Sequence, residues 1–178
     1  MKNVKFLLSA ALVFLASAAL AQDFSAPQYA KWGATPEERE QNILNSNFLK
    51  ESCDNRDYDA AAHYLKGLID KIPDAAESIY QRGAVVYKNK INRAKSVAEK
   101  NMFIDSLMLM YDMRAQYFGD NVKPGKTAFI LDQKAREFLR YKPNDRKGIR
   151  EAFRAAIAQG GDLSLIHISE PTRPEPIS

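Results

Sequence analysis

Residues 55–73 read Asn-Arg-Asp-Tyr-Asp-Ala-Ala-Ala-His-Tyr-Leu-Lys-Gly-Leu-Ile-Asp-Lys-Ile-Pro. The stretch begins with residues that favour a turn, continues with an amphipathic pattern and stops at a proline. A small residue, two leucines and that proline define the pattern at offsets of 0, +4, +7 and +12: Ala61, Leu65, Leu68 and Pro73. Offsets of 4 and 7 return to the same side of a helix, so the stretch predicts a short helix with one buried face.

This pattern resembles the second helix of a tetratricopeptide repeat (TPR). That family has a small residue, two apolar residues and a helix-ending proline at these offsets, and the small residue lets two helices approach closely. Gly83 lies 22 residues after Ala61, the interval expected between the small residue of one repeat and the glycine of the next. The likeness is specific over residues 42–87 and loose over residues 88–161. It implies a secreted bacterial helical-repeat protein that binds a partner and catalyses nothing.

Helix-start and helix-stop patterns divide residues 35–162 into six helices. The predicted starts are Thr35-Pro36-Glu37-Glu38, Asp57, Asp74 to Glu77, Ser96 to Glu99, the turn Lys123-Pro124-Gly125, and Asn144 or Asp145. The predicted ends are Ser52, Pro73, a break over residues 89–95, Gly119, Tyr141 and Gly160-Gly161. Period-2 alternation is not sustained anywhere, so we predict an all-α fold. The resemblance implies antiparallel hairpins stacked as a TPR-like right-handed α-solenoid of about three hairpins, incomplete at the C-terminus.

Apolar residues at helical spacing predict which side of each helix faces inward. In chain order, these are Ile43, Leu44, Phe48 and Leu49; Ala61, Leu65, Leu68, Ile69 and Ile72; Ile79, Gly83, Val86 and Tyr87; Phe103, Leu107, Met110 and Tyr111; Ala128, Leu131, Ala135, Phe138 and Leu139; and Ile149, Ala152, Phe153, Ala156 and Ile157. Residues 22–34 form an irregular lead-in, and we expect it to pack over the first helix because Trp32 is costly to expose.

The N-terminal residues 1–21 carry two lysines and then an apolar run that ends in Ala19-Leu20-Ala21. This pattern predicts a secretory signal peptide that is cleaved before Gln22. The run is shorter than the roughly 20 apolar residues that a membrane-spanning helix needs. We therefore expect an exported protein that is periplasmic or envelope-associated and does not span the membrane once processed.

The C-terminal residues 163–178 have no helical period and contain three prolines among the last eight residues. Residues 164–174 closely resemble a translated sequencing adapter joined to a truncated reading frame. We expect a disordered, non-native tail and a gene that continues beyond about residue 162. The alternative is a genuine proline-rich disordered tail. If the chain is truncated, the last helix leaves an apolar face uncovered, which predicts self-association.

Charge and cysteine content narrow the function classes. Lys and Arg number 26 and Asp and Glu 22, for a net charge of +4 with both signs interspersed. An exported protein of this balance is not expected to bind nucleic acid. Cys53 is the only cysteine, so no internal disulfide forms, and the two histidines are His63 and His167. One cysteine and one histidine outside the tail are too few for a transition-metal site, and we expect no cofactor.

Two local clusters invite a catalytic or cation-binding interpretation, and both fit a structural role better. Asp54, Asp57 and Asp59 lack the ligand spacing and the glycine of an EF-hand calcium loop, so we interpret them as helix-capping residues. A nucleophile at Cys53 would need His63 as its base and a third orienting group, which the sequence does not suggest. We expect a small buried thiol and a surface histidine.

Two further stretches have both a structural and a functional interpretation. The basic run over residues 88–95 is expected to be a solvated loop; the alternative is a patch for an acidic glycolipid or peptide. Its members are Lys88, Lys90, Arg93 and Lys95. The methionine-rich and aromatic stripe over residues 102–117 is expected to be core rather than a cofactor site.

The resemblance places a partner-binding groove on the first helix of each hairpin. Carried over position by position, the groove would comprise Ile43, Ser46, Lys50, Cys53, Glu77, Tyr80, Ala84 and Tyr87. Among them, Lys50 would anchor a carboxylate, while Tyr80 and Tyr87 would offer rigid aromatic contacts. The partner is expected to be a protein or peptide. Two alternatives stay open: a structural module of a larger envelope protein, and the repeat region of an enzyme whose active site follows residue 162.

Overall fold

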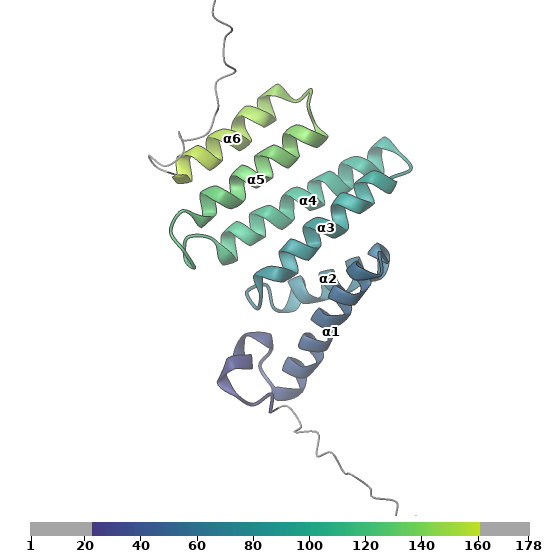
Figure 1. The fold of residues 1–178 in the computed structure, drawn as a ribbon, viewed down its shortest axis with the longest axis vertical. Coiled ribbons are helices and arrows are strands. Elements are labelled where there is room, and N and C mark those ends of the chain that lie inside the picture. Colours follow the sequence, from purple (N-terminus) through teal and green to yellow (C-terminus); the bar gives the residue numbers. More distant parts are fainter. Residues whose placement is uncertain (1–22, 161–178) are drawn as a thin grey trace, which may run out of the picture.

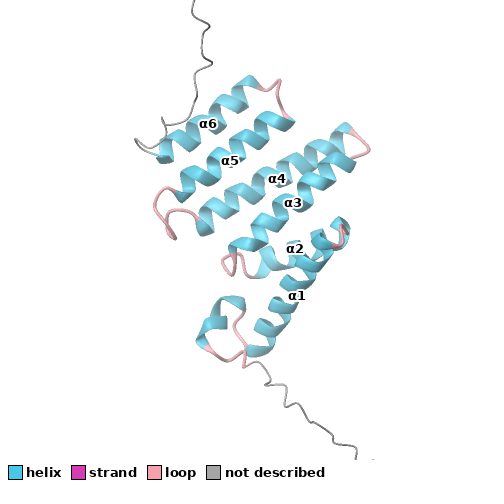
Figure 2. Cartoon of the chain, viewed as in Figure 1, coloured by secondary structure: helices cyan, strands magenta, loops and turns pink. Residues whose placement is uncertain are grey.

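The computed structural model describes residues 23–160, and this part of the chain is entirely helices and connecting loops (Figure 2). It contains one 3-10 helix and six α-helices and no strand, which confirms the all-α prediction for these residues. The elements are η1 (Pro27–Trp32), α1 (Pro36–Asp54), α2 (Tyr58–Lys71), α3 (Glu77–Arg93), α4 (Val97–Phe118), α5 (Lys126–Tyr141) and α6 (Arg146–Gly160). The predicted signal peptide and adapter-like tail lie outside the described residues.

The helices follow one another through space in chain order (Figure 1). Each packs on the next, η1 lies against α1, and α1 also reaches α3. Short connections reverse the chain between neighbours, so α3, α4, α5 and α6 lie side by side in alternating directions. The result is an elongated body with α1 near one end and α6 at the other.

Side-chain caps begin most of the helices where the sequence predicts them. The Thr35 hydroxyl accepts a hydrogen bond from the Glu38 amide at 3.2 Å, and the Glu38 carboxylate accepts one from the Thr35 amide at 3.4 Å. Asp57 and Ser96 accept from the amides three residues later, both at 3.1 Å. Asp145 rather than Asn144 caps α6, since its carboxylate accepts from the Gly148 amide at 2.9 Å.

The predicted boundaries of α3 were wrong at both ends. No side chain caps this helix, which begins at Glu77 after Ala76. The preceding turn is instead held by the Tyr80 hydroxyl, which donates to the Pro73 carbonyl at 2.6 Å. At the other end α3 continues to Arg93, so most of the basic run lies on a helix and not in a solvated loop.

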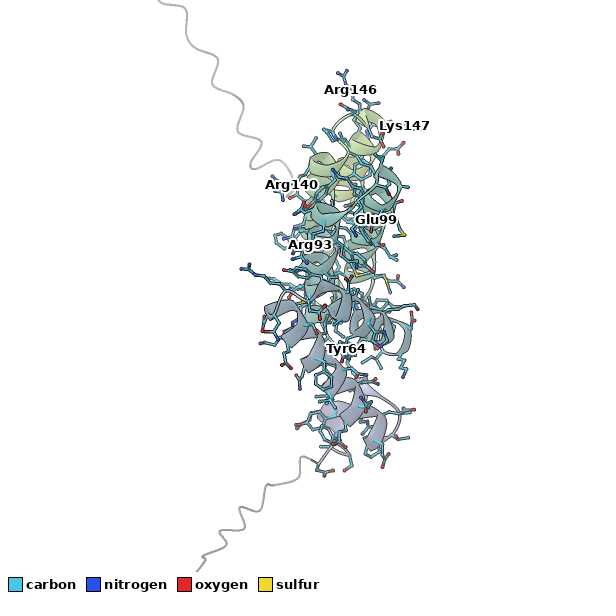
Figure 3. All side chains as sticks on the ribbon, turned by 90° about the vertical axis from the view of Figure 1, so that its right-hand side faces the viewer. Tyr64, Arg93, Glu99, Arg140, Arg146 and Lys147 are labelled. Atoms are coloured by element: carbon cyan, nitrogen blue, oxygen red, sulfur yellow. The ribbon has the colours of Figure 1, made fainter. Side chains whose placement is uncertain are left out.

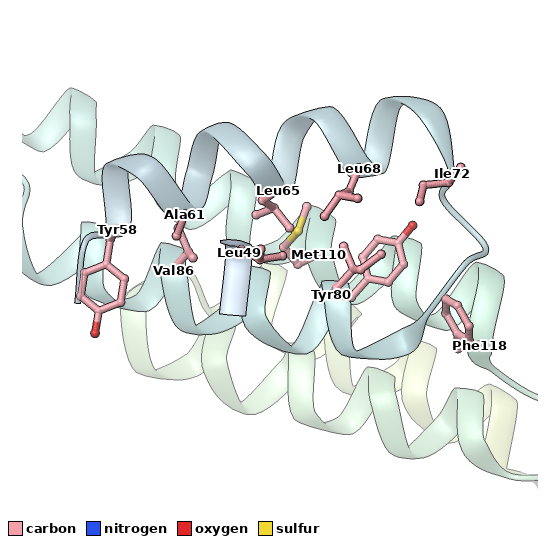
Figure 4. Packing of buried hydrophobic residues seen from close by; sticks show 11 residues of the cluster. Leu49, Tyr58, Ala61, Leu65, Leu68, Ile72, Tyr80, Val86, Met110 and Phe118 are labelled. Atoms are coloured by element: carbon pink, nitrogen blue, oxygen red, sulfur yellow. The ribbon is translucent and has the colours of Figure 1, made fainter. Parts of the chain in front are cut away.

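The main core lies where α1, α2, α3 and α4 meet (Figure 4). Ala61, Leu65 and Leu68 are each at most 1% exposed, and their neighbours come from three other helices. A second cluster joins the end of α3 to α4 and α5: Ile91, Ile104, Leu107, Met108, Tyr111 and Ile130. Trp32 packs against the main core and accepts a hydrogen bond from Asn42 through its carbonyl, so the lead-in does cover α1.

Gly83 lies where side chains from two other helices crowd against α3. A Cβ atom at this position would stand 2.7 Å from the Met110 sulfur and 3.1 Å from a methyl group of Leu65. These residues belong to α3, α4 and α2 respectively. A side chain at this position would displace the ends of Met110 and Leu65, so glycine favours the present packing of the three helices.

The sequence predicted burial least well for residues at the edges of the apolar stripes. Leu44 is 42% exposed, Leu139 44% and Ile157 53%, although all three were expected to face inward. Conversely, Ile130 is fully buried and was not expected to be. Each exposed residue lies at the border of its stripe, where a small rotation of the helix decides burial.

Candidate functional site

On the described part of the molecule, a furrow between α2 and α4 has a volume of about 560 Å³. Both helices pack on α3, but their backbones do not pack on each other. Leu65, Tyr87 and Met110 contribute to the lining from three helices, and Met102, Leu109 and Met113 come from α4. We call this furrow the methionine groove.

Large apolar side chains in the methionine groove remain open to solvent. Met102 is 56% exposed and Leu109 is 52% exposed, whereas the neighbouring Met110 is only 4% exposed. Leucine and methionine of this exposure, gathered in one concave surface, are typical of sites that bind apolar side chains of another molecule. Methionine adapts its shape to different partners because its side chain is unbranched and polarisable.

The charged residues at the rim of the groove are largely neutralised by neighbours. Lys66 pairs with Asp70 at 2.5 Å, and that hydrogen bond raises the pKa of Lys66. Lys90 pairs with Asp59 and also lies over the Phe103 ring, 5.1 Å from its centre. Since its cations are occupied, the groove favours apolar contacts over charged ligands.

The residues that the resemblance places in a groove are scattered over different surroundings. Tyr87 is half-buried and lines the methionine groove. Ser46 is buried in α1, while Lys50 is exposed and pairs with Asp54 at 2.7 Å. Tyr80 is 1% exposed and burial raises the pKa of its hydroxyl, which is already bonded to Pro73. Because Tyr80 is buried, it offers no surface to a partner.

Glu77 joins three helices through its carboxylate. Its carboxylate accepts hydrogen bonds from Arg114 of α4 at 2.9 Å and from Lys126 of α5 at 2.6 Å. Arg114 also donates to Gln133 at 2.9 Å. Burial raises the pKa of Glu77, but the hydrogen bonds from Lys126 and Arg114 outweigh it, so the pKa lies below its ordinary value. These contacts make Glu77 a structural residue.

A second ion pair repeats this bridge farther along the same two helices. Lys88 of α3 pairs with Glu137 of α5, and both partners are largely buried. Burial lowers the pKa of Lys88, but the hydrogen bond to Glu137 outweighs this effect and the pKa is raised. In both bridges the partners are 49 residues apart in sequence. The two bridges are 11 residues apart on each helix, about three turns, so α3 and α5 run parallel and in register.

Cys53 and His63 do not share surroundings. Cys53 is half-buried beside the main core, and burial raises the pKa of its thiol, which disfavours the nucleophilic thiolate. His63 is exposed, and the centre of its ring lies 5.7 Å from the centre of the Tyr64 ring.

Over residues 23–160 no group of three His, Cys, Asp or Glu side chains could hold a metal ion. Nor is any helix in this range both long and apolar enough to cross a membrane.

Sequence reasoning missed the methionine groove because it assigned the whole apolar pattern of α4 to the core. A second stripe is visible in the sequence at offsets of 0, +4, +7 and +11: Met102, Ser106, Leu109 and Met113. It lies on another side of α4 from the buried Leu107 and Tyr111. A helix with apolar residues on two sides has either two buried faces or one buried face and one binding face.

The chain was compared with protein-family models, with curated proteins and with solved structures, and none of these three comparisons found a match.

Proposed function

We propose that this protein is an exported, non-catalytic helical-repeat scaffold that binds an amphipathic helix of a protein partner in the methionine groove. The observation that carries the proposal is the exposure of Met102 and Leu109 within one concave surface. A partner helix would place its own apolar residues there, at the i, i+3, i+4 and i+7 positions.

The dimensions of the groove support a helical partner. The exposed stripe of α4 runs from Met102 to Met113, which is about 16 Å along the helix axis or three turns. This length matches two or three apolar anchors of a partner helix. Because Lys66 and Lys90 are already paired, we expect the affinity to depend on apolar contact and to change little with salt.

We also propose that the helices form a TPR-like right-handed α-solenoid, with α1–α2, α3–α4 and α5–α6 as its hairpins. The close approach at Gly83 and the complete burial of Ala61 support this, since small residues at these positions are what the resemblance requires. The hairpins are longer than the family's 34-residue repeat: α3 begins 41 residues after α1, and α5 begins 49 residues after α3. The repeats would therefore be irregular ones.

Site-specific photo-crosslinking in the envelope of an expressing cell tests the binding proposal. A photoreactive phenylalanine analogue would replace Met102 in the groove, or Val97 as a control that is 77% exposed on the same helix but does not line the groove. We expect the Met102 position alone to crosslink, and the crosslinked peptide to be an amphipathic helix of another protein. Equal yields at both positions would contradict the proposal, and a crosslink to this chain's own residues would favour a structural module.

Export is tested separately by sequencing the N-terminus of the mature protein from a Gram-negative host. We expect the sequence to begin at Gln22. Retention of Met1 in a membrane fraction would contradict export and would leave the groove proposal unaffected.

A further inference from the structure

The last hairpin differs in charge from the rest of the described chain. Residues 126–160 contain nine lysines and arginines and four acidic residues, a net charge of +5. Residues 23–125 contain fourteen basic and fifteen acidic residues, a net charge of −1. The excess positive charge is therefore concentrated on α5 and α6, at one end of the molecule.

Three arginines of α6 form one exposed row. Arg146, Arg150 and Arg154 are spaced by four residues, so they follow one another along the same side of the helix. All three side chains are exposed, and in the described part of the chain their guanidinium groups form no ion pair or hydrogen bond. Ile157 lies three residues after Arg154, on the same side of α6, and is 53% exposed. We call these four residues the arginine row.

The arginine row works against the stability of its own helix. Like charges four residues apart repel each other along a helix. Arg146 and Lys147 also stand in the first turn, where the helix dipole favours negative charge, and the acidic residue at this end of α6 is the N-cap Asp145, just before that turn. In contrast, Lys88, Lys126 and Arg114 are satisfied by acidic partners inside the fold. Over residues 23–160 no ion pair of the row offsets this repulsion, which leaves the three guanidinium groups available to another molecule.

From this charge pattern we infer that the arginine row is a second binding surface, whose ligand is an acidic helix of a protein. Steps of four residues advance about 6 Å along an α-helix, so carboxylates at the same spacing on a partner helix would meet the three guanidinium groups in order. Arginine binds carboxylates in a bidentate manner, and Ile157 adds an apolar contact at the end of the row. Figure 3 shows Arg146 at the far end of the described part of the molecule.

An anionic membrane surface is the competing ligand, and the packing of α6 disfavours it. An amphipathic helix binds a bilayer by inserting its apolar face. The apolar face of α6 is already used, because Ala156 is buried and Ile149 and Phe153 are half-buried in the fold. The side that remains exposed carries the three arginines at regular four-residue spacing, with Ile157 as its one large apolar residue.

Fluorescence anisotropy with a labelled synthetic helix tests the inference on the full chain. The probe carries Glu at every fourth position and one Leu at the end of that row, and a matched probe carries Gln in place of Glu. We expect the Glu probe to bind and the double variant R150Q/R154Q to weaken binding about tenfold at low salt. The variant R150K/R154K should lose less affinity than R150Q/R154Q because it keeps both charges. It should still bind more weakly than the parent, because lysine is not bidentate.

The control variant K100Q/K123Q removes the same two charges from exposed residues elsewhere and should bind the probe as the parent does. Equal weakening by the control would overturn the inference, and so would equal binding of the Gln probe. Vesicles of anionic phosphatidylglycerol provide the last comparison. If they bound the chain more tightly than the Glu probe and depended on Arg150 and Arg154, the surface would be a membrane site and the inference wrong. Failure of this test leaves the methionine groove untouched, because the groove lies on other helices.

Discussion

The first four helices and the last hairpin are attached to the molecule by different forces. The main core takes its eleven buried residues from α1 to α4, whereas α6 buries only Ala156. The last hairpin is joined to its neighbours by the second apolar cluster, through Ile130 of α5, and also by four ion pairs: Glu77–Lys126, Lys88–Glu137, Lys134–Asp112 and Lys142–Asp105. The comparison teaches that one elongated fold has an apolar half, α1 to α4, and a charged half, α5 and α6, in which ion pairs add to the apolar contacts.

Gly83→Ala should give the largest effect and should act on the apolar half. The added methyl group would overlap Met110 and Leu65, so we expect destabilisation by about 1–3 kcal/mol in urea unfolding. Gly67→Ala is the matched control, because a methyl group added there would meet no other side chain or neighbouring element within 4 Å. It should stabilise by about 0.5–1 kcal/mol, since alanine favours the helix. If both variants behaved alike, the close approach of the three helices would be wrong.

Glu77→Gln should loosen the charged half and leave the apolar half intact. Loss of the carboxylate leaves Arg114 and Lys126 without their ion-pair partner. Glu77 is 24% exposed, so we expect a cost of about 1–2 kcal/mol rather than that of a fully buried pair. Amide hydrogen exchange should quicken in α5 and α6 but not in α2. The control Lys66→Gln breaks an exposed ion pair and should change neither the stability nor the hydrogen exchange of α5 and α6. Faster hydrogen exchange in α2 after Glu77→Gln would contradict the comparison.

Acid should loosen the last hairpin before the rest of the molecule. The pKa of Glu77 is lower in the folded state than its ordinary value of about 4.3, so the stabilisation is complete above that value and is lost as the pH falls through the folded pKa. Below about pH 4 we expect helix content, measured by circular dichroism, to fall before the fluorescence of Trp32 changes. Trp32 is the only tryptophan and reports on the apolar half. Coincident changes would contradict this prediction, and Glu77→Gln should reduce the pH dependence.

Oxidation should have the smallest effect on the fold. Mild peroxide should convert Met102 to its sulfoxide well before Met108 and Met110, because only Met102 is largely exposed. We expect peptide mapping to show this order and the melting temperature to change by less than about 2 °C. Faster oxidation of Met110 would mean that this buried residue of the methionine groove becomes accessible to solvent.

The sequence predicted the helix starts better than the ion pairs that join distant helices, because helix starts depend on local residues. Capping boxes and apolar periodicity are local, so Thr35, Asp57 and Ser96 mark helix starts without knowledge of the fold. The start of α3 was missed because a distant hydroxyl, that of Tyr80, holds its turn. The bridges of Glu77 and Glu137 join residues 37 to 49 positions apart, and no local pattern reveals such pairs.

The same distinction holds for the candidate site. Tyr87 was predicted as a contact residue and does line the methionine groove, but the resemblance gave no reason to choose Met102 or Leu109. Tyr80 was chosen for its aromatic surface, yet the packing of Tyr117 and Phe118 around it encloses that surface. Periodicity gives the side of a helix on which a residue lies, whereas its exposure depends on which neighbours cover that side.

The two ion-pair bridges between α3 and α5 have opposite polarity: the acidic partner is on α3 in one and on α5 in the other. This arrangement favours one direction of α5 relative to α3. On α3 the order is Glu77 and then Lys88, while on α5 it is Lys126 and then Glu137. If α5 docked upside down, Glu137 would face Glu77 and Lys126 would face Lys88. A slide of three turns would likewise bring two residues of the same sign together. Like-charge repulsion therefore disfavours packing of the last hairpin in the reversed orientation or three turns out of register. The positions of these four charges favour one orientation and one register as the hairpin packs during folding.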